Sequence, residues 1–256
     1  MSQTLERGIS LLMHLSEIAL GQGDPRVALK DIATAVSMDK ATAFRLLKSL
    51  EKFKLVEDDG KGNYWIGSAA LVLSQAAART NGLISQSIPV MRELAALTGE
   101  TISLAERRDH TSVTLYEIES AQAVRYANKI GLAAPLHAGS GPRVILAFSE
   151  PSVINEVLTR HLQRFNPATI TDPVRLEREL RQCRKDGYAV SSGERVSGTN
   201  SISVPLCGID GHARGAMSIL WPSRGVDIDR ERIRDWPPIL QAATRNLHVG
   251  FQRQVA

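Results

Sequence analysis

In the first 67 residues, the pattern of apolar and polar positions is first typical of helices and then typical of strands. Apolar residues recur three and four positions apart over residues 5–16, 29–36 and 43–50, the spacing of helices that each bury one face. Only residues 37–39 separate the second helix from the third. The following LVEDDGKGNYWIG, residues 55–67, has the composition of a strand, a glycine-rich turn and a second strand. The pattern predicts a winged helix-turn-helix.

The third predicted helix carries basic side chains opposite its leucines, with Asp39 as its expected N-cap. Residues 40–54 hold five basic residues and one acidic residue, a net charge of +4, whereas residues 1–82 sum to +1. A helix that enters the major groove needs short side chains near the bases and cations near the phosphates. The predicted DNA contacts are Lys40, Ala41, Thr42, Arg45, Lys48 and Lys52 on the helix and Lys61 in the wing. Arg45 is the candidate for a bidentate guanine contact; the alternative is a solvated basic face.

The remaining chain predicts a second, α+β domain. The alanine-rich SAALVLSQAAART favours a helical linker. Strand-like alternation marks TISLAER, SVTLYEI, AVRYANKI, YAVSS, TNSISVPLCG and RGAMSILW, and helical patterns mark PRVILAFS, SVINEVLT, DPVRLERELRQCRKD and a final segment from about Asp229 to Val249. Runs of strands interrupted by helices favour an antiparallel sheet covered by helices. The predicted domains are 1–67 for DNA binding, 68–84 for the linker and 85–256 for the second domain.

Composition is that of a globular protein with a core. The 256 residues are 43% hydrophobic and 23% charged, with a mildly basic pI near 9.2. The sequence has no apolar run long enough for a membrane span and no signal-peptide pattern at its start, so we expect a cytoplasmic protein that does not bind membranes. Cys183, Cys207 and the six histidines lack metal-ligand spacing, so no metal or cofactor is expected.

Two other classes of function, an enzyme and a protein-docking module, are alternatives to DNA binding. For an enzyme, the nucleophile pattern G-x-S-x-G around Ser140 fails because position 138 is alanine, and no phosphate-binding glycine motif is present. We therefore expect no catalytic residues. A winged helix can also serve as a protein-docking surface, and DNA affinity that depends on salt would distinguish the two.

Several separated segments, in order, resemble the IclR family of bacterial transcriptional regulators. They are LERGISLLMHLSE, LKDIATAVSMDKATAFRLLKSLEKFKLVE and YWIGSAALVLS in the first domain, and TGETISLAERR, PLHAGSGPRVILAF, CRKDGYAVSSGERVSGTNSISVPL and GAMSIL in the second. The resemblance covers nearly the whole chain. It implies a winged helix-turn-helix joined by a helix to a GAF-like effector-binding domain, in a DNA-binding regulator that forms a dimer or a dimer of dimers.

The resemblance also implies an effector pocket. Carried across to this sequence, its lining residues are Ser140, Gly141, Ser191, Ser201 and Ser218. The residues themselves suggest an anion site in the loop LHAGSGPR, where a strand passes into a helix, with a plain tight turn as the alternative.

The sequence departs from the family at two places. Pro142 and Arg143 stand where a glycine-lysine pair is common, and Ser191 and Ser192 replace an acidic pair, leaving Glu194 and Gly198 of the E-x-x-x-G motif. Fewer acids, with Arg125, His137 and Arg143 nearby in sequence, favour a small organic acid, although each of these cations has a structural alternative. The effector, the operator and the sign of regulation stay open.

Overall fold

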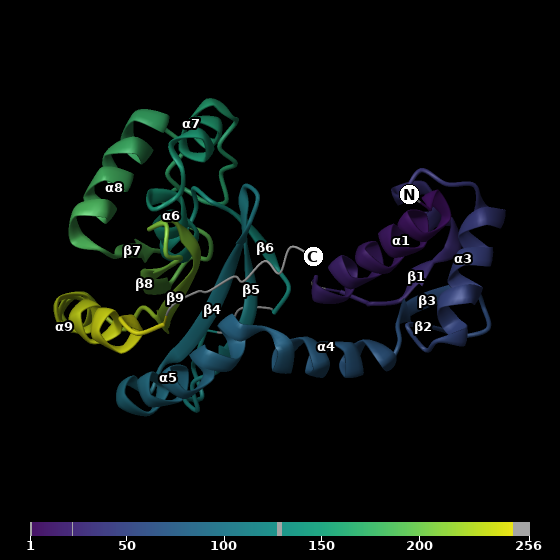
Figure 1. Ribbon diagram of the computed structural model, residues 1–256, viewed down its shortest axis with the longest axis horizontal. Helices are drawn as coiled ribbons and strands as arrows, with labels where there is room; N and C mark the ends of the chain where they lie inside the picture. Colours follow the sequence, from purple (N-terminus) through teal and green to yellow (C-terminus); the bar gives the residue numbers. More distant parts are fainter. Residues whose placement is uncertain (1, 22, 127–129, 248–256) are drawn as a thin grey trace. The chain divides into compact units, whose positions relative to one another are not determined.

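The computed structural model describes residues 2–21, 23–126 and 130–247, which fall into two compact units, residues 1–80 and 81–256 (Figure 1). Each unit has its own sheet, of three strands in the first and six in the second. The predicted linker, residues 68–84, covers the last helix of the first unit and the start of the first helix of the second, with Asn81 between them.

The first unit is a winged helix-turn-helix, as the sequence predicts. Its elements are α1 (Gln3–Leu20), β1 (Val27–Ala28), α2 (Leu29–Ala35), α3 (Lys40–Lys52), β2 (Val56–Asp58), β3 (Asn63–Ile66) and α4 (Ala69–Thr80). The side chain of Asp39 accepts a hydrogen bond from the backbone N–H of Thr42 at 2.9 Å, which fixes the start of α3. β2 and β3 form the antiparallel wing, and β1 pairs with β3 on the side away from β2.

The core of this unit lies between α1, α2, α3 and the wing. Leu11 and Leu15 of α1 are fully buried with Ile32, Leu47 and Tyr64. Tyr64 of β3 therefore points into the core, whereas its neighbour Trp65 is only partly buried. Other apolar side chains of α1 lie off this buried face and are exposed.

The second unit is an antiparallel sheet with helices on both faces. Its elements are α5 (Gly82–Thr98), β4 (Thr101–Arg108), β5 (Thr111–Ile118), β6 (Ala133–Pro135), α6 (Ser140–Ala147), α7 (Pro151–Thr159), α8 (Pro173–Asp186), β7 (Ala189–Ser192), β8 (Thr199–Cys207), β9 (Ala213–Pro222) and α9 (Val226–Thr244). The strand order is β6-β5-β4-β9-β8-β7, with every neighbouring pair antiparallel. The predicted α+β class is confirmed.

The sheet has one apolar face and one face rich in hydroxyl groups. Ile202, Ile219 and Trp221 are fully buried on the first face, where the Trp221 indole N–H donates to Asp229 of α9 at 2.7 Å. On the opposite face, Ser203 of β8 pairs with Ser218 of β9 in register, and Ser218 pairs with Ser103 of β4. Because successive side chains of a strand alternate between faces, this register aligns serines from three strands in one row.

One predicted strand is wrong. The segment AVRYANKI, residues 123–130, is irregular over residues 123–126, and Val124 is exposed, so its apolar alternation does not reflect a buried face. The third strand of the meander is instead β6, which pairs with β5. Residues 127–129, and Val249 at the predicted end of the last helix, lie outside the described residues.

Candidate functional site

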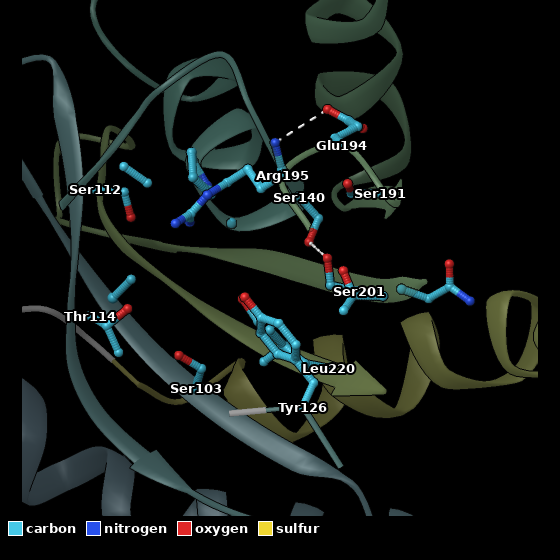
Figure 2. A pocket seen from close by; sticks show the side chains of 18 residues that line it. Ser103, Ser112, Thr114, Tyr126, Ser140, Ser191, Glu194, Arg195, Ser201 and Leu220 are labelled. Carbon is cyan, nitrogen blue, oxygen red and sulfur yellow. Dashed lines mark hydrogen bonds between the residues drawn. The ribbon is translucent and has the colours of Figure 1, made fainter. Parts of the chain in front are cut away.

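A cavity opens on the hydroxyl-rich face of the second unit, at the N-terminus of α6. The five pocket residues predicted from the family resemblance, Ser140, Gly141, Ser191, Ser201 and Ser218, all line it (Figure 2). Each comes from a different place in the chain: α6 supplies the first two, and β7, β8 and β9 supply one each. The tertiary fold therefore brings the predicted set together.

Serine hydroxyls form a hydrogen-bonded chain along the floor of the cavity. The Ser140 hydroxyl lies 2.6 Å from that of Ser201 and 2.7 Å from that of Ser203, which in turn lies 2.7 Å from that of Ser218. A hydroxyl both donates and accepts, so the chain can reorient its protons to suit a ligand carbonyl, hydroxyl or carboxylate.

Two glycines allow α6 to approach the sheet this closely. Gly139 precedes α6 with a positive φ of 99°, a conformation that side chains disfavour. A Cβ atom on Gly141 would lie 3.2 Å from the Ser218 hydroxyl oxygen, closer than ordinary contact allows. The GSG sequence is therefore required by the narrow space between helix and sheet.

A buried ion pair anchors the α6 end of the cavity to the loop that follows β7. The Arg143 guanidinium donates to both carboxylate oxygens of Glu194 at 2.6 Å, and Arg143 also donates to the carbonyl of Val190. Glu194 accepts a further hydrogen bond from the Gly139 backbone N–H at 3.2 Å. Burial alone would lower the pKa of Arg143, but the Glu194 carboxylate reverses this and raises it. Arg143 thus has a structural role and does not line the cavity.

The other two cations expected near the ligand also lie outside the cavity. Arg125 is exposed and pairs with Glu119 at 2.9 Å, and a ring nitrogen of His137 lies 2.9 Å from the carbonyl of Gln163. Burial lowers the pKa of His137, which favours its neutral form. All three cations therefore take the structural alternative that the sequence left open for them, and none of them lines the cavity.

Arg195 is the cation that does line the cavity, and the sequence did not single it out. It follows Glu194 directly, and Figure 2 shows its side chain extending into the space ringed by the labelled residues. Burial lowers the pKa of Arg195, and the Tyr126 phenol partly offsets this shift. Within the described part of the chain, no carboxylate forms an ion pair with Arg195, so its charge faces the cavity uncompensated.

The predicted DNA-binding residues lie on α3 and the wing of the first unit. Lys40, Ala41, Arg45 and Lys52 are exposed on α3, and Lys61 is exposed at the tip of the wing. Thr42 is half-buried, and its hydroxyl accepts a hydrogen bond from Arg45 at 3.3 Å, which holds the guanidinium near the start of the helix.

Lys48 has an additional role that the sequence did not reveal. Its ammonium lies 2.6 Å from both Glu51 of α3 and Asp58 of β2. The hydrogen bonds to Asp58 and Glu51 raise the pKa of Lys48, and the bond from Lys48 lowers that of Asp58. Lys48 therefore fastens the wing to α3, and its charge is largely compensated within the unit.

Phe44 is a further surface residue that the helical pattern overlooked. It lies on α3 between the predicted contacts Thr42 and Arg45, and 43% of its surface is exposed. The Lys48 ammonium lies 6.0 Å from the centre of the Phe44 ring. An exposed aromatic on this helix can contact a thymine methyl group.

The described residues hold no cluster of three or more potential metal ligands, and no helix among them is long and apolar enough to cross a membrane.

Comparisons with known proteins connect both features to one family. The model of the IclR helix-turn-helix domain matches residues 4–60, and the model of the bacterial transcriptional regulator IclR C-terminal domain matches residues 75–248. The chain belongs to the IclR family. As an IclR-type protein, it is a DNA-binding transcriptional regulator rather than an enzyme.

Curated relatives include the HTH-type transcriptional repressor AllR of Escherichia coli K12. It is 32% identical to this IclR-family chain over 241 residues, covering 91% of this chain and 87% of the repressor. The AllR repressor of Klebsiella pneumoniae is also 32% identical, over 231 residues, covering 90% of this chain and 83% of its own.

Solved IclR structures share the fold. An IclR regulator from Alicyclobacillus acidocaldarius superposes with a TM-score of 0.85 at 25% identity, covering 95% of this chain and 98% of its own. An IclR homologue from Microbacterium hydrocarbonoxydans, solved with 4-hydroxybenzoate, has a TM-score of 0.76 at 23% identity, covering 95% and 99%. The second comparison supports the shared fold alone.

Proposed function

We propose that this IclR-family regulator binds operator DNA through α3 and the wing, and that a small organic acid bound in the C-terminal pocket controls that binding. The observation that carries the proposal is the pairing of a basic, exposed recognition helix with a buried hydroxyl-lined cavity that contains an uncompensated arginine. A bacterial regulator that binds chromosomal DNA acts in the cytoplasm, which agrees with the predicted location.

On the DNA side, the side chains divide into base-reading and phosphate-binding groups. Arg45, positioned by Thr42, reads a guanine, and Ala41 and Phe44 approach thymine methyl groups near the start of α3. Lys40, Lys52 and Lys61 bind phosphates on either side. Lys48 contributes chiefly by holding the wing in place, because its ammonium already lies against two carboxylates.

The proposed assembly is a homodimer or a dimer of dimers, because one winged helix buries too little surface for operator specificity. Two exposed apolar surfaces of the first unit support this assembly. Leu5, Ile9 and Met13 form a stripe at four-residue spacing on α1, with 62%, 50% and 52% of their surfaces exposed. On α4, Leu71, Val72 and Leu73 are also exposed, and none of the helix is buried. Exposed apolar patches of this kind mark contact surfaces.

On the effector side, the pocket offers hydroxyl groups, the guanidinium of Arg195, and the carboxylate of Glu194, which is already paired with Arg143. That inventory matches a carboxylate whose remaining atoms are polar. A relative with the same fold was solved with 4-hydroxybenzoate, which is an organic acid. We propose the same broad class for this pocket.

The proposed mechanism couples the two sites through the dimer. Effector binding selects one of two arrangements of the C-terminal units, and the helical linker transmits that choice to the spacing of the two recognition helices. Such coupling is reciprocal: the factor by which effector changes operator affinity equals the factor by which operator changes effector affinity.

The test is selection of bound sequences from fragmented genomic DNA, followed by titration of the selected site by fluorescence anisotropy at two salt concentrations. The proposal expects one preferred sequence with two half-sites and an affinity that falls steeply as salt rises. If the protein shows no sequence preference, or if its DNA affinity does not change with salt concentration, the proposed DNA binding is wrong. That result would favour a protein-docking role for the winged helix.

A further inference from the structure

We infer that Asp59 is a positioning residue for DNA binding, whose carboxylate shapes the tip of the wing so that Lys61 is presented to the phosphate backbone. The inference rests on the proposed function, which assigns Lys61 to a phosphate. It goes beyond that function by naming the residue that places this cation. Its consequence is that removal of a negative charge beside the DNA can weaken DNA binding.

The wing has an unfavourable net charge for an element that lies against phosphates. Residues 56–66 hold Glu57, Asp58 and Asp59 against Lys61 alone, a net charge of −2. DNA affinity depends on cations that neutralise phosphates, and a carboxylate close to the backbone opposes that attraction. A wing of this composition can support binding when its acids are engaged within the unit and its lysine extends away from them.

Two of the three carboxylates fasten β2 to its surroundings. Glu57 accepts a hydrogen bond from the Ser68 backbone N–H at 3.3 Å. Asp58 accepts from the Lys48 ammonium and from the Gly60 backbone N–H, both at 2.6 Å. These contacts join β2 to α3 and to the residue that precedes α4, so the base of the wing is held firmly.

Asp59, by contrast, organises the tip itself. One oxygen of its carboxylate accepts from the backbone N–H groups of Lys61 and Asn63, at 2.8 and 3.1 Å, and the other accepts from the Asn63 side-chain amide at 2.6 Å. The Asp59 backbone N–H donates to the Asn63 carbonyl at 3.2 Å. The hydrogen bonds from Asn63 and Lys61 lower the pKa of Asp59 to about 2, so the carboxylate is ionised at neutral pH. Residues 59–63 thus close into a loop around one ionised carboxylate.

The same loop leaves Lys61 free to extend from the tip. Lys61 is exposed, and its ammonium pairs with no carboxylate among the described residues. Gly60 and Gly62, on either side of it, have φ values of 70° and 90°, and an added Cβ at either would meet nothing beyond its chain neighbours within 4 Å. The Leu29 backbone N–H donates to the Gly62 carbonyl at 3.0 Å, which ties the returning side of the tip to the start of α2. The backbone on both sides of Lys61 is therefore fixed, while its side chain faces open space.

The charge of Asp59 and its hydrogen bonds have opposite effects on DNA binding. As a charge, Asp59 repels phosphates, so its removal should strengthen binding. As the centre of the loop, it holds the Lys61 backbone in place, and a cation on an ordered backbone loses less conformational entropy when it binds. Asparagine and alanine separate these effects, because both remove the charge but only asparagine keeps an oxygen that can accept from the two backbone N–H groups.

The test compares Asp59→Asn with Asp59→Ala by fluorescence anisotropy on two duplexes, the selected operator and a random sequence of equal length, over a series of salt concentrations. We expect Asp59→Asn to bind both duplexes at least as tightly as the unmodified protein. Asp59→Ala should bind both at least threefold more weakly than Asp59→Asn, since a phosphate contact is independent of sequence. Lys61→Ala should also bind both more weakly, and its slope of log affinity against log salt should fall by about 1.

A double-mutant cycle distinguishes placement of Lys61 from a general loosening of the wing. In the Lys61→Ala background, Asp59→Asn and Asp59→Ala should bind equally, because no cation is left to place. Circular dichroism establishes that each variant is folded. Glu17→Gln and Glu17→Ala are the matched control pair, because Glu17 is an exposed acid on α1 outside the wing, and these two variants should bind alike.

Three outcomes would overturn the inference while the unmodified protein still binds its operator. The first is an affinity of Asp59→Ala equal to or tighter than that of Asp59→Asn. The second is a difference between these two variants that persists in the Lys61→Ala background, and the third is unchanged affinity in Lys61→Ala itself. Failure of the unmodified protein to bind either duplex would instead defeat the proposed function.

Discussion

Arg143 and Glu194, 51 positions apart in the sequence, form a buried ion pair that joins α6 to the loop between β7 and β8. Glu194 also accepts a hydrogen bond from the Gly139 backbone N–H at 3.2 Å, so the pair ties the turn before α6 to the loop that carries Arg195. A buried pair of this kind is costly to break, because the remaining charge has no partner and no water.

Arg143→Ala should lower the free energy of unfolding by about 3 to 5 kcal/mol. The reason is that Glu194 is left charged and buried. Urea denaturation followed by circular dichroism measures the change, and Glu194→Gln provides a second variant with a loss of similar origin. Arg125→Ala, which removes an exposed ion pair, should change the same quantity by about 0 to 1 kcal/mol. Equal stability of the Arg143 and Arg125 variants would show that the buried pair does not stabilise the unit.

Arg45→Ala should weaken operator binding by about 1 to 3 kcal/mol and relax the preference at one base pair. Lys52→Ala should weaken binding to all sequences alike and reduce the dependence of affinity on salt. Anisotropy titrations with the selected operator and with random DNA separate these effects. Arg92→Ala removes the same charge from an exposed position on α5 and should leave both affinities unchanged. A loss in Arg45→Ala that is equal for operator and random DNA would contradict its role as a base reader.

The Lys48–Asp58 contact should make the wing sensitive to acid. Hydrogen bonding from Lys48 lowers the pKa of Asp58 in the folded unit, so the contact stabilises the fold fully above the ordinary aspartate value of 3.8. As pH falls through the lowered pKa, Asp58 binds a proton and that stabilisation is lost. Asp58→Asn should therefore weaken hydrogen-exchange protection of the β2 and β3 amides at neutral pH, and this difference from the unmodified protein should shrink below pH 3.8. A difference that stays constant with pH would mean that the ion pair does not fasten the wing.

Gly141→Ala should reduce effector affinity while operator binding is retained. The added methyl group would lie 3.2 Å from the Ser218 hydroxyl oxygen, inside the serine chain, and would displace it. Calorimetry with a small organic acid that binds the unmodified protein measures the effect. Gly82→Ala is a suitable control, since its methyl group would meet only the Gln86 side chain, at 3.7 Å. Unchanged acid affinity in Gly141→Ala would place the ligand away from the serine chain.

Local signals in the sequence were sufficient for the first unit and for most elements of the second. Asp39 caps α3 as expected, and Gly187 ends α8 in a left-handed conformation, because these effects depend on a few neighbouring residues. The segment around Val124 misled the prediction, since apolar alternation indicates a strand only when one face is buried. The short β6 carries too few residues to show any alternation.

Only part of the pocket could be predicted from the sequence, namely its serines and not its charged residues. Its serines follow from family motifs, and the sheet register brings them together. The sequence could not tell which arginine faces the cavity, because Arg143 and Arg195 are distinguished by their tertiary partners. Glu194 neutralises one of them and leaves the other facing the cavity, and that distinction depends on a contact across 51 positions.

The most direct test of the account is a thermodynamic cycle between the two sites. It consists of operator affinity measured with and without a saturating small organic acid that binds the pocket, and affinity for that acid measured with and without saturating operator. The account predicts that both affinities change, by the same factor. Equal acid affinity in the presence and absence of operator would contradict the claim that occupancy of the pocket controls DNA binding.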